Sequence, residues 1–298
     1  MRSEDEPLRA THVLQAHEGP AFAAAFPGSN RLLSAGWDRS VRLWDLQLGR
    51  MITELHGHED VVSCAAASVG GDRAATGDWA GVVCVWDVPA GRCLAKLDGH
   101  SNRVQSVRLA PDGEVVYSAS RDGTIRARRV DGSRVMHDLV GHEGRVHGLA
   151  VCHAIGLVVS GGADRTVRLW DIAGGSTRVL HGHEGVVTSC AVSLDGRLAI
   201  TASDDRTLRT WDTADGRCRH VLARHTDMVL CVDLAADGSV AVSGAEDGAV
   251  RTWDPQTGQC TGASEPEGAW VLGVALSPDR NRVVAALRDG TLRAFALR

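Results

Sequence analysis

The chain has 298 residues, of which 44% are hydrophobic, and its formal net charge is −5. This hydrophobic content supplies a large core and argues against a disordered chain. The negative charge argues against nucleic-acid binding by bulk charge. No run approaches the roughly 18 consecutive apolar residues that a membrane span requires, so we expect no membrane partner.

The first seven residues, MRSEDEP, are predicted to form a short acidic tail, residues 1–7. They contain no apolar run, which argues against a secretory signal and favours a cytoplasmic location. None of the eight cysteines lies in a CxxC pair or at zinc-finger spacing with histidine. Most lie in apolar, strand-like runs, where cysteine packs as a small hydrophobic residue. We therefore expect no metal and no cofactor.

From residue 8 onward the sequence repeats at a period of 41 or 42 residues. One marker is a Trp-Asp pair, whose tryptophans are Trp44, Trp86, Trp170, Trp211 and Trp253. The one doubled interval predicts a unit with a changed marker at Arg128, and one further period reaches Phe295. The second marker occupies His17, His58, His100, His142, His183 and His225, with Glu267 in the seventh place. Two markers in one register predict seven units.

Each unit reads as four short strands. Residues 186–222 contain four apolar runs separated by LDG, SDDR and ADG, which are turn sequences. Four antiparallel strands cannot bury both faces of one small sheet, but stacked units can. Gly-His and Trp-Asp pairs at this period resemble WD-repeat (WD40) β-propellers, and the resemblance covers residues 8–298. It implies an all-β, seven-bladed propeller as a single domain over residues 8–298.

The seventh unit is one strand short, because only three residues follow Phe295. Residues 8–14 precede the first unit at the place where every other unit follows an outer strand. In the family that this chain resembles, such a segment typically completes the last blade. We therefore expect residues 8–14 to close the seventh blade and to remove an unpaired sheet edge.

Polar residues recur at fixed offsets from the tryptophan, with Ser or Thr ten residues before it and Asp six residues before it. Together with the histidine they resemble the hydrogen-bonded tetrad of WD-repeat blades. Four units carry all four residues: His17, Ser34, Asp38 and Trp44; His142, Ser160, Asp164 and Trp170; His183, Thr201, Asp205 and Trp211; and His225, Ser243, Asp247 and Trp253. Four copies around a ring favour a structural network over a hydrolase triad.

The second, third and seventh units depart from this pattern. Ala80 stands at the expected aspartate position of the second unit, and Arg128 replaces the tryptophan of the third. The seventh unit has Glu267, Ala285 and Phe295 at three of the four positions. We expect packing, more than tetrads, to hold these blades.

Candidate binding residues are those that the repeat does not explain. The resemblance implies an interaction face with two contact positions per blade, three residues after the histidine and directly before the tetrad aspartate. We expect partner binding by Trp37, Trp79, Trp270, Arg103, Arg121, Arg145, Arg288 and Met228. The tryptophans fall in blades seven, one and two, and the first three arginines in blades three and four. The alternative is that these tryptophans pack on neighbouring loops.

The favoured function is a non-catalytic protein-interaction scaffold, or adaptor, in a larger complex. Its partner is another protein or peptide of unstated identity, for which an acidic or phosphorylated segment would suit the arginines. A lectin-like, glycan-binding propeller is the alternative, because exposed tryptophan also stacks on sugars. An enzyme is less favoured, because one histidine is a poor metal site in the expected channel lining of Phe22, Ser63, Gln105, His147, Thr188, Leu230 and Leu272.

Overall fold

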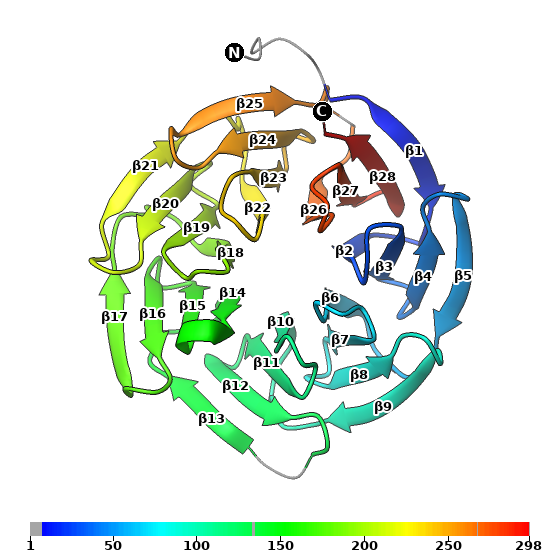
Figure 1. Ribbon diagram of the computed structural model, residues 1–298, viewed down its shortest axis with the longest axis horizontal. Coiled ribbons are helices and arrows are strands. Elements are labelled where there is room, and N and C mark those ends of the chain that lie inside the picture. The colour runs from blue at the N-terminus through cyan, green and yellow to red at the C-terminus, as the bar shows by residue number, and fades with distance from the viewer. Residues whose placement is uncertain (1–7, 133–134, 267, 298) are drawn as a thin grey trace.

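The computed structural model describes residues 8–132, 135–266 and 268–297. Seven four-stranded antiparallel sheets surround a central axis (Figure 1). The chain is therefore an all-β, seven-bladed propeller, and the predicted fold class is confirmed. Within the described ranges, no helix is long and apolar enough to cross a membrane. The expected acidic tail, residues 1–7, and the seventh marker, Glu267, lie outside the described residues.

The strands of each blade run in chain order from the axis outward. Blade one contains β2 (Ala21–Ala25), β3 (Arg31–Gly36), β4 (Val41–Asp45) and β5 (Arg50–Leu55). Blade two contains β6 (Val62–Ala67), β7 (Arg73–Asp78), β8 (Val83–Asp87) and β9 (Arg92–Leu97). Blade three contains β10 (Val104–Leu109), β11 (Val115–Ser120), β12 (Thr124–Arg129) and β13 (Val135–Val140). Blade four contains β14 (Val146–Cys152), β15 (Leu157–Gly162), β16 (Val167–Asp171) and β17 (Ser176–Leu180), with the short 3-10 helix η1 (His153–Ile155) after β14.

The second half of the ring repeats this order. Blade five contains β18 (Val187–Val192), β19 (Leu198–Ser203), β20 (Leu208–Asp212) and β21 (Cys218–Leu222). Blade six contains β22 (Val229–Leu234), β23 (Ala241–Ala245), β24 (Val250–Asp254) and β25 (Gln259–Ala263). Blade seven contains β26 (Val271–Leu276), β27 (Arg282–Leu287) and β28 (Thr291–Ala296), and its outer strand is β1 (Ala10–Gln15).

The first and last strands meet in blade seven, as predicted. Strand β1 pairs antiparallel with β28, and Figure 1 shows the blue β1 outside the dark red β28. The closing strand begins at Ala10, two residues later than expected. Leu8 instead forms a bridge with Ser264, and its N–H donates to the carbonyl of Ala263 at 2.8 Å. The closing segment therefore joins blade six as well as blade seven.

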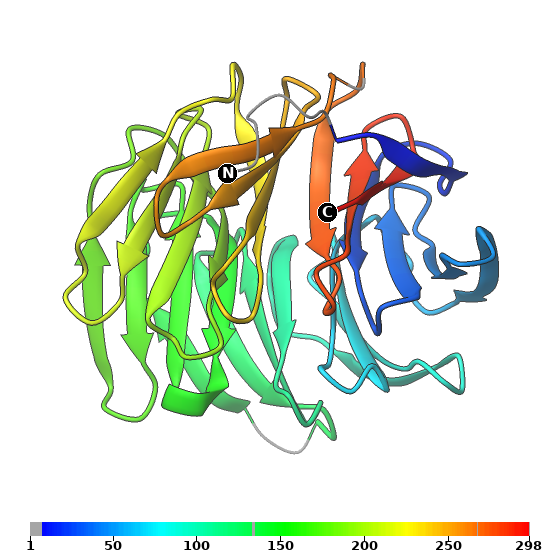
Figure 2. The same cartoon turned by 45° about the horizontal axis from the view of Figure 1, so that its top comes forward.

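The hydrophobic core lies between the blades. Each of the seven clusters of buried apolar residues in the described part of the chain draws on two neighbouring sheets. Between blades one and two, for example, Leu33 and Leu43 pack with Ala74 and Trp86. A blade alone would expose such faces, so the sheets stabilise one another around the closed ring. Figure 2 shows the sheets standing side by side around the axis.

Candidate functional site

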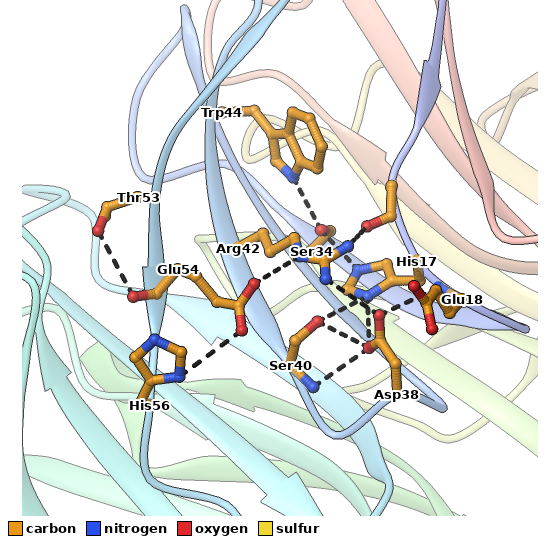
Figure 3. Close-up of polar contacts among 11 residues, drawn as sticks. His17, Glu18, Ser34, Asp38, Ser40, Arg42, Trp44, Thr53, Glu54 and His56 are labelled. Atoms are coloured by element: carbon orange, nitrogen blue, oxygen red, sulfur yellow. Dashed lines mark hydrogen bonds and ion pairs between the residues drawn. The ribbon is translucent and has the colours of Figure 1, made fainter.

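The tetrad of blade one forms a continuous hydrogen-bonded chain (Figure 3). The Trp44 Nε1–H donates to Ser34 Oγ at 2.8 Å, and the Ser34 hydroxyl lies 2.8 Å from His17 Nε2. His17 Nδ1 lies 2.8 Å from Asp38 Oδ1, which also accepts from the Ser40 hydroxyl at 2.7 Å. Burial lowers the pKa of His17, so the ring is neutral and bridges hydroxyl to carboxylate.

Blades four, five and six contain the same network. The distance from histidine Nδ1 to aspartate Oδ2 is 2.9, 2.8 and 2.9 Å in the pairs His142–Asp164, His183–Asp205 and His225–Asp247. Each tryptophan donates its N–H to the Ser or Thr hydroxyl at 2.8 or 2.9 Å. These buried polar groups satisfy one another, which assigns them to blade geometry and leaves no free nucleophile among them.

Blade two also contains a complete tetrad, and here the sequence-based expectation is wrong. His58 Nδ1 lies 2.7 Å from Asp78 Oδ2, while Thr76 contacts the other ring nitrogen and accepts from Trp86. Asp78 precedes the usual position by two residues, and Ala80 occupies that position. The equivalent of Asp78 in blade one is Gly36, where an added Cβ would lie 2.6 Å from the His17 ring. A side chain at this place therefore points at the histidine, and an aspartate there replaces the missing carboxylate.

Blade three retains most of its tetrad. His100 Nδ1 lies 2.8 Å from Asp122 Oδ2, and His100 Nε2 lies 2.8 Å from Ser118 Oγ. No tryptophan completes this hydrogen-bonded network, because Arg128 stands at the tryptophan position. Arg128, at the tryptophan position, donates to the carbonyl of Asp98. Blade seven fits the expectation of packing, because Phe295 is fully buried in the cluster between blades six and seven.

The two contact positions of each blade are hydrogen-bonded neighbours. In all seven blades the N–H of the residue before the tetrad aspartate position donates to the carbonyl of the residue three places after the histidine marker, at 2.8–3.1 Å. The pairs are Trp37 with Pro20, Trp79 with Val61, Arg121 with Arg103, Ala163 with Arg145, Asp204 with Val186, Glu246 with Met228, and Arg288 with Trp270. We call the surface formed by these loops and turns the upper face.

Turns also touch loops between blades. The turn after Trp79 packs on the loop that carries Arg103, and an added Cβ on its Gly81 would meet the carbonyl of His100. The turn after Arg121 packs on the loop that carries Arg145 in the same way. The contact positions of blades two, three and four therefore lie next to one another on the upper face.

Trp37 and Trp79 form an aromatic cluster with Phe22. The two indole rings meet edge to face with centroids 5.1 Å apart, and Phe22 lies 6.4 and 6.1 Å from them. Trp37 remains 47% exposed. The alternative of loop packing is thus partly realised, since Trp79 packs on its neighbours while Trp37 covers Gly19 and still faces solvent.

Trp270 and Met228 are the other two apolar candidates on the upper face. The Arg288 guanidinium lies over the Trp270 ring at 4.0 Å from its centroid. Among the described residues, the ring contacts that join Trp37 and Trp79 do not extend to Trp270. Met228 is 41% exposed in the loop before blade six. The upper face therefore carries two aromatic sites, each with an arginine stacked on a tryptophan.

Arg103, Arg121 and Arg145 form a basic cluster next to the larger aromatic site. The Arg103 guanidinium lies 3.5 Å from the centroid of Trp79, a close cation–π contact. Burial, together with the charges of Arg103 and Arg145, lowers the pKa of Arg121. Within the described residues none of the three forms an ion pair, whereas the repeated arginine Arg42 contacts both Asp38 and Glu54. The cluster is therefore a concentration of positive charge that no ion pair among the described residues neutralises.

Blades five and six carry the opposite charge on the same face. The pKa values of Asp204 and Glu246 are raised, chiefly by burial and also by Asp205 and Asp227 respectively. The upper face is thus basic over blades three and four and acidic over blades five and six.

A β-bulge turns one side chain of each inner strand toward the central channel. The ladder between the first and second strands shifts by one residue at the same place in all seven blades. The bulged residues are the seven expected lining positions, and all of them line a cavity of about 330 Å³. Near its rim, Gln105 Nε2 lies 3.1 Å from His147 Nδ1. Burial and the charges of Arg121 and Arg145 lower the pKa of His147 to about 4.

Two channel residues escaped the sequence-based reasoning. Eight residues after the histidine marker the sequence has alanine in five units, but Arg108 in the third and Asp233 in the sixth. Arg108 reaches the carbonyl of Cys190 in blade five at 3.4 Å, and Asp233 accepts the N–H of Leu276 in blade seven at 2.8 Å. Burial raises the pKa of Asp233. The break in the alanine pattern was the signal that could have found them.

The described residues contain no group of three His, Cys, Asp or Glu side chains placed to hold a metal ion. Cys64 and Cys190 are buried thiols whose pKa values burial raises to about 12, so their reactive thiolate forms are suppressed. The groups that the upper face presents are aromatic rings and guanidinium donors.

Comparison with known proteins places the chain in a family. No curated protein matches it. The family model described as the IFT122 first beta-propeller matches residues 21–296, which run from the first strand of blade one to the last residue of β28. This family has a scaffold-like, protein-interaction fold. The chain belongs to the family of the IFT122 first beta-propeller.

Proposed function

We propose that this propeller is a non-catalytic scaffold that holds a partner protein or peptide on its upper face, as a subunit of a larger complex. The observation that carries the proposal is the continuous surface formed by the Trp37–Trp79 pair and the basic cluster Arg103, Arg121 and Arg145. The repeat does not explain these residues, and tryptophan and arginine are the side chains that most often anchor interfaces.

The stacked arginines favour a polypeptide over a glycan as the partner. A sugar ring binds by lying flat on an exposed aromatic face. Arg103 covers one face of Trp79 and Arg288 covers one face of Trp270. The arginines instead suit an acidic or phosphorylated segment of the partner, because guanidinium binds carboxylate and phosphate oxygens through two parallel hydrogen bonds.

Two further elements of the proposal rest on side-chain chemistry. The absence of catalysis is supported by the tetrads, whose Ser, His and Asp groups bond to one another within the blades. A cytoplasmic location is supported by the eight cysteines, all of which are unpaired thiols, as a reducing compartment requires.

The test is capture of partner chains by a tagged propeller from its native extract, followed by their identification. The variant Trp37→Ala/Trp79→Ala/Trp270→Ala should lose the captured chains. The matched control is Val69→Ala/Leu194→Ala, which removes exposed apolar side chains from loops at the opposite ends of the strands and should keep them. Circular dichroism and melting temperature establish that each variant folds. Unchanged capture by a folded triple variant would contradict the proposal, and glycan binding that the triple variant loses would favour the lectin alternative.

A further inference from the structure

The basic cluster is assembled by two neighbouring blades and by direct backbone contacts. The Arg121 N–H donates to the Arg103 carbonyl at 2.9 Å within blade three. The turn after Arg121 then contacts blade four, where an added Cβ on Gly123 would lie 3.1 Å from the Gly144 carbonyl oxygen, next to Arg145. The three arginines thus extend from adjoining backbone segments.

No ion pair within the described residues neutralises the cluster. The charged groups that act on Arg121 are the two other arginines, and both destabilise its charged form. Within the described residues its buried Nε atom has no hydrogen-bond partner, a feature that it shares with the repeat arginines Arg126 and Arg168. Like charges gathered in partly buried surroundings raise the free energy of the unliganded protein, and an anion bound between them removes that repulsion.

One arginine of the cluster is also held in place before any ligand binds. The guanidinium carbon of Arg103 lies 3.5 Å from the centroid of the Trp79 ring, and Trp79 in turn packs edge to face on Trp37. A stacked guanidinium keeps the N–H groups at its edge available for hydrogen bonds in its own plane. The loss of side-chain entropy on binding is correspondingly smaller.

We propose that Arg103, Arg121 and Arg145 form one binding site for a phosphate monoester group on a phosphorylated side chain of the partner. The site rests on the proposed function, because it names the chemistry by which the upper face recognises its partner. A phosphoryl group carries a charge of about −1.5 to −2 at neutral pH and presents three acceptor oxygens. A carboxylate carries one charge and would leave most of the positive charge of three arginines unbalanced.

The tryptophan pair then reads the residues beside the phosphorylated one. Trp37 faces solvent next to Trp79, so an apolar side chain of the same segment packs on it when the phosphate lies on Arg103. The partner segment thus combines a phosphorylated residue with a neighbouring apolar residue.

The experiment compares three immobilised peptide libraries that differ at one central position, which is phosphoserine, glutamate or serine. The propeller should bind the phosphoserine library at least about tenfold more tightly than the glutamate library. Arg121→Ala/Arg145→Ala should lower phosphopeptide affinity by about a hundredfold, and Arg121→Lys by about tenfold, because lysine keeps the charge but loses the planar fork. The matched control is Arg224→Ala, which removes an exposed arginine from the loop before blade six and should leave affinity unchanged.

Equal binding of the phosphoserine and glutamate libraries would overturn the phosphate assignment in favour of a carboxylate site. An equal loss in Arg224→Ala would overturn it in favour of bulk charge. Exposed Arg145 is replaced alone if the double variant fails to fold, and unchanged affinity of that folded variant also contradicts the site. Partner capture that depends on the tryptophans but not on these arginines would leave the proposed function standing and remove only this inference.

Discussion

Asp122 and Arg121 are neighbours in the sequence but belong to two different parts of the molecule. The Asp122 carboxylate accepts hydrogen bonds from His100 and Thr124, and these bonds lower its pKa to about 2 although burial opposes them. The Arg121 guanidinium has no ion-pair partner in the described chain and lies near two like charges. The tetrad aspartate is thus satisfied within its blade, whereas its neighbour Arg121 has no opposite charge paired with it in the described chain.

The largest expected effect separates a repeat tryptophan from a tryptophan of the upper face. Trp211 is 1% exposed and donates to Thr201, so Trp211→Ala should lower the free energy of unfolding by about 3–5 kcal/mol. Trp37 is exposed, so Trp37→Ala should lower the free energy of unfolding by less than about 1 kcal/mol. Denaturant unfolding measures both. Similar losses for the two would show that Trp37 belongs to the core and would remove the distinction.

The shifted tetrad of blade two predicts a smaller loss with a specific rescue. Asp78→Gly leaves His58 without its carboxylate and should lower the free energy of unfolding by about 1–3 kcal/mol. Adding Ala80→Asp to that variant moves the carboxylate to the position used in the other blades and should restore part of the loss. Ala80→Asp in the wild-type protein is the control and should not raise the free energy of unfolding. A double variant no more stable than Asp78→Gly would show that the two positions are not equivalent.

Acid should weaken the ring before it protonates the tetrad aspartates. Burial lowers the pKa values of His17, His100 and His142 in the folded protein, and the pKa of His147 is about 4. The unfolded chain, with histidine pKa values near 6.5, binds more protons below that pH, so the free energy of unfolding falls as pH decreases from about 6.5 toward 4. Denaturant midpoints at a series of pH values measure the fall, and a flat profile over this window would contradict it.

The pKa of His147 depends on the basic cluster. Arg121 and Arg145 help to lower the pKa of His147, so Arg121→Ala should raise that pKa toward its usual value. A titration followed by nuclear magnetic resonance measures the shift, with Arg224→Ala as the control. An unchanged pKa would mean that the charge of Arg121 does not act on His147.

The smallest expected effect concerns turns rather than networks. Arg206 has a φ of 70° in the turn of blade five, where blades three and six have Gly123 and Gly248. A left-handed backbone is strained for arginine but not for glycine, although glycine also makes the unfolded chain more flexible. Arg206→Gly should therefore raise the free energy of unfolding by no more than about 1 kcal/mol. A clear decrease would assign the Arg206 side chain a stabilising contact.

The fold was predictable because its determinants are periodic. Histidine and tryptophan markers recur in one register, so they predicted the number of blades and the closing strand. Asp78 was missed because offsets along the sequence do not show that a side chain two residues earlier can reach the same histidine. Leu8 was placed in blade seven for a similar reason, since the pattern does not show where the closing segment crosses from blade six.

The candidate site was predictable only as a set of positions. The sequence placed Trp37, Trp79 and Arg103 on one face, but cation–π stacking between blades depends on how loops meet in space. It also placed Trp270 in the blade next to that of Trp37, but it could not show that Trp270 contacts Arg288 while Trp37 contacts Trp79. Arg108 and Asp233 went unnoticed because the lining was read at one offset, while the channel extends over several residues of each inner strand.

The central claim is that the repeat builds the ring while the upper face over blades one to four binds the partner. Amide hydrogen exchange of the propeller, with and without its co-purified partner, tests this claim most directly. Binding should slow exchange in the upper loops and turns, which are residues 18–22, 78–82, 101–104, 120–124 and 143–147. Slowing confined to the opposite loops, such as residues 68–72 and 193–197, or to the outer strands would contradict it.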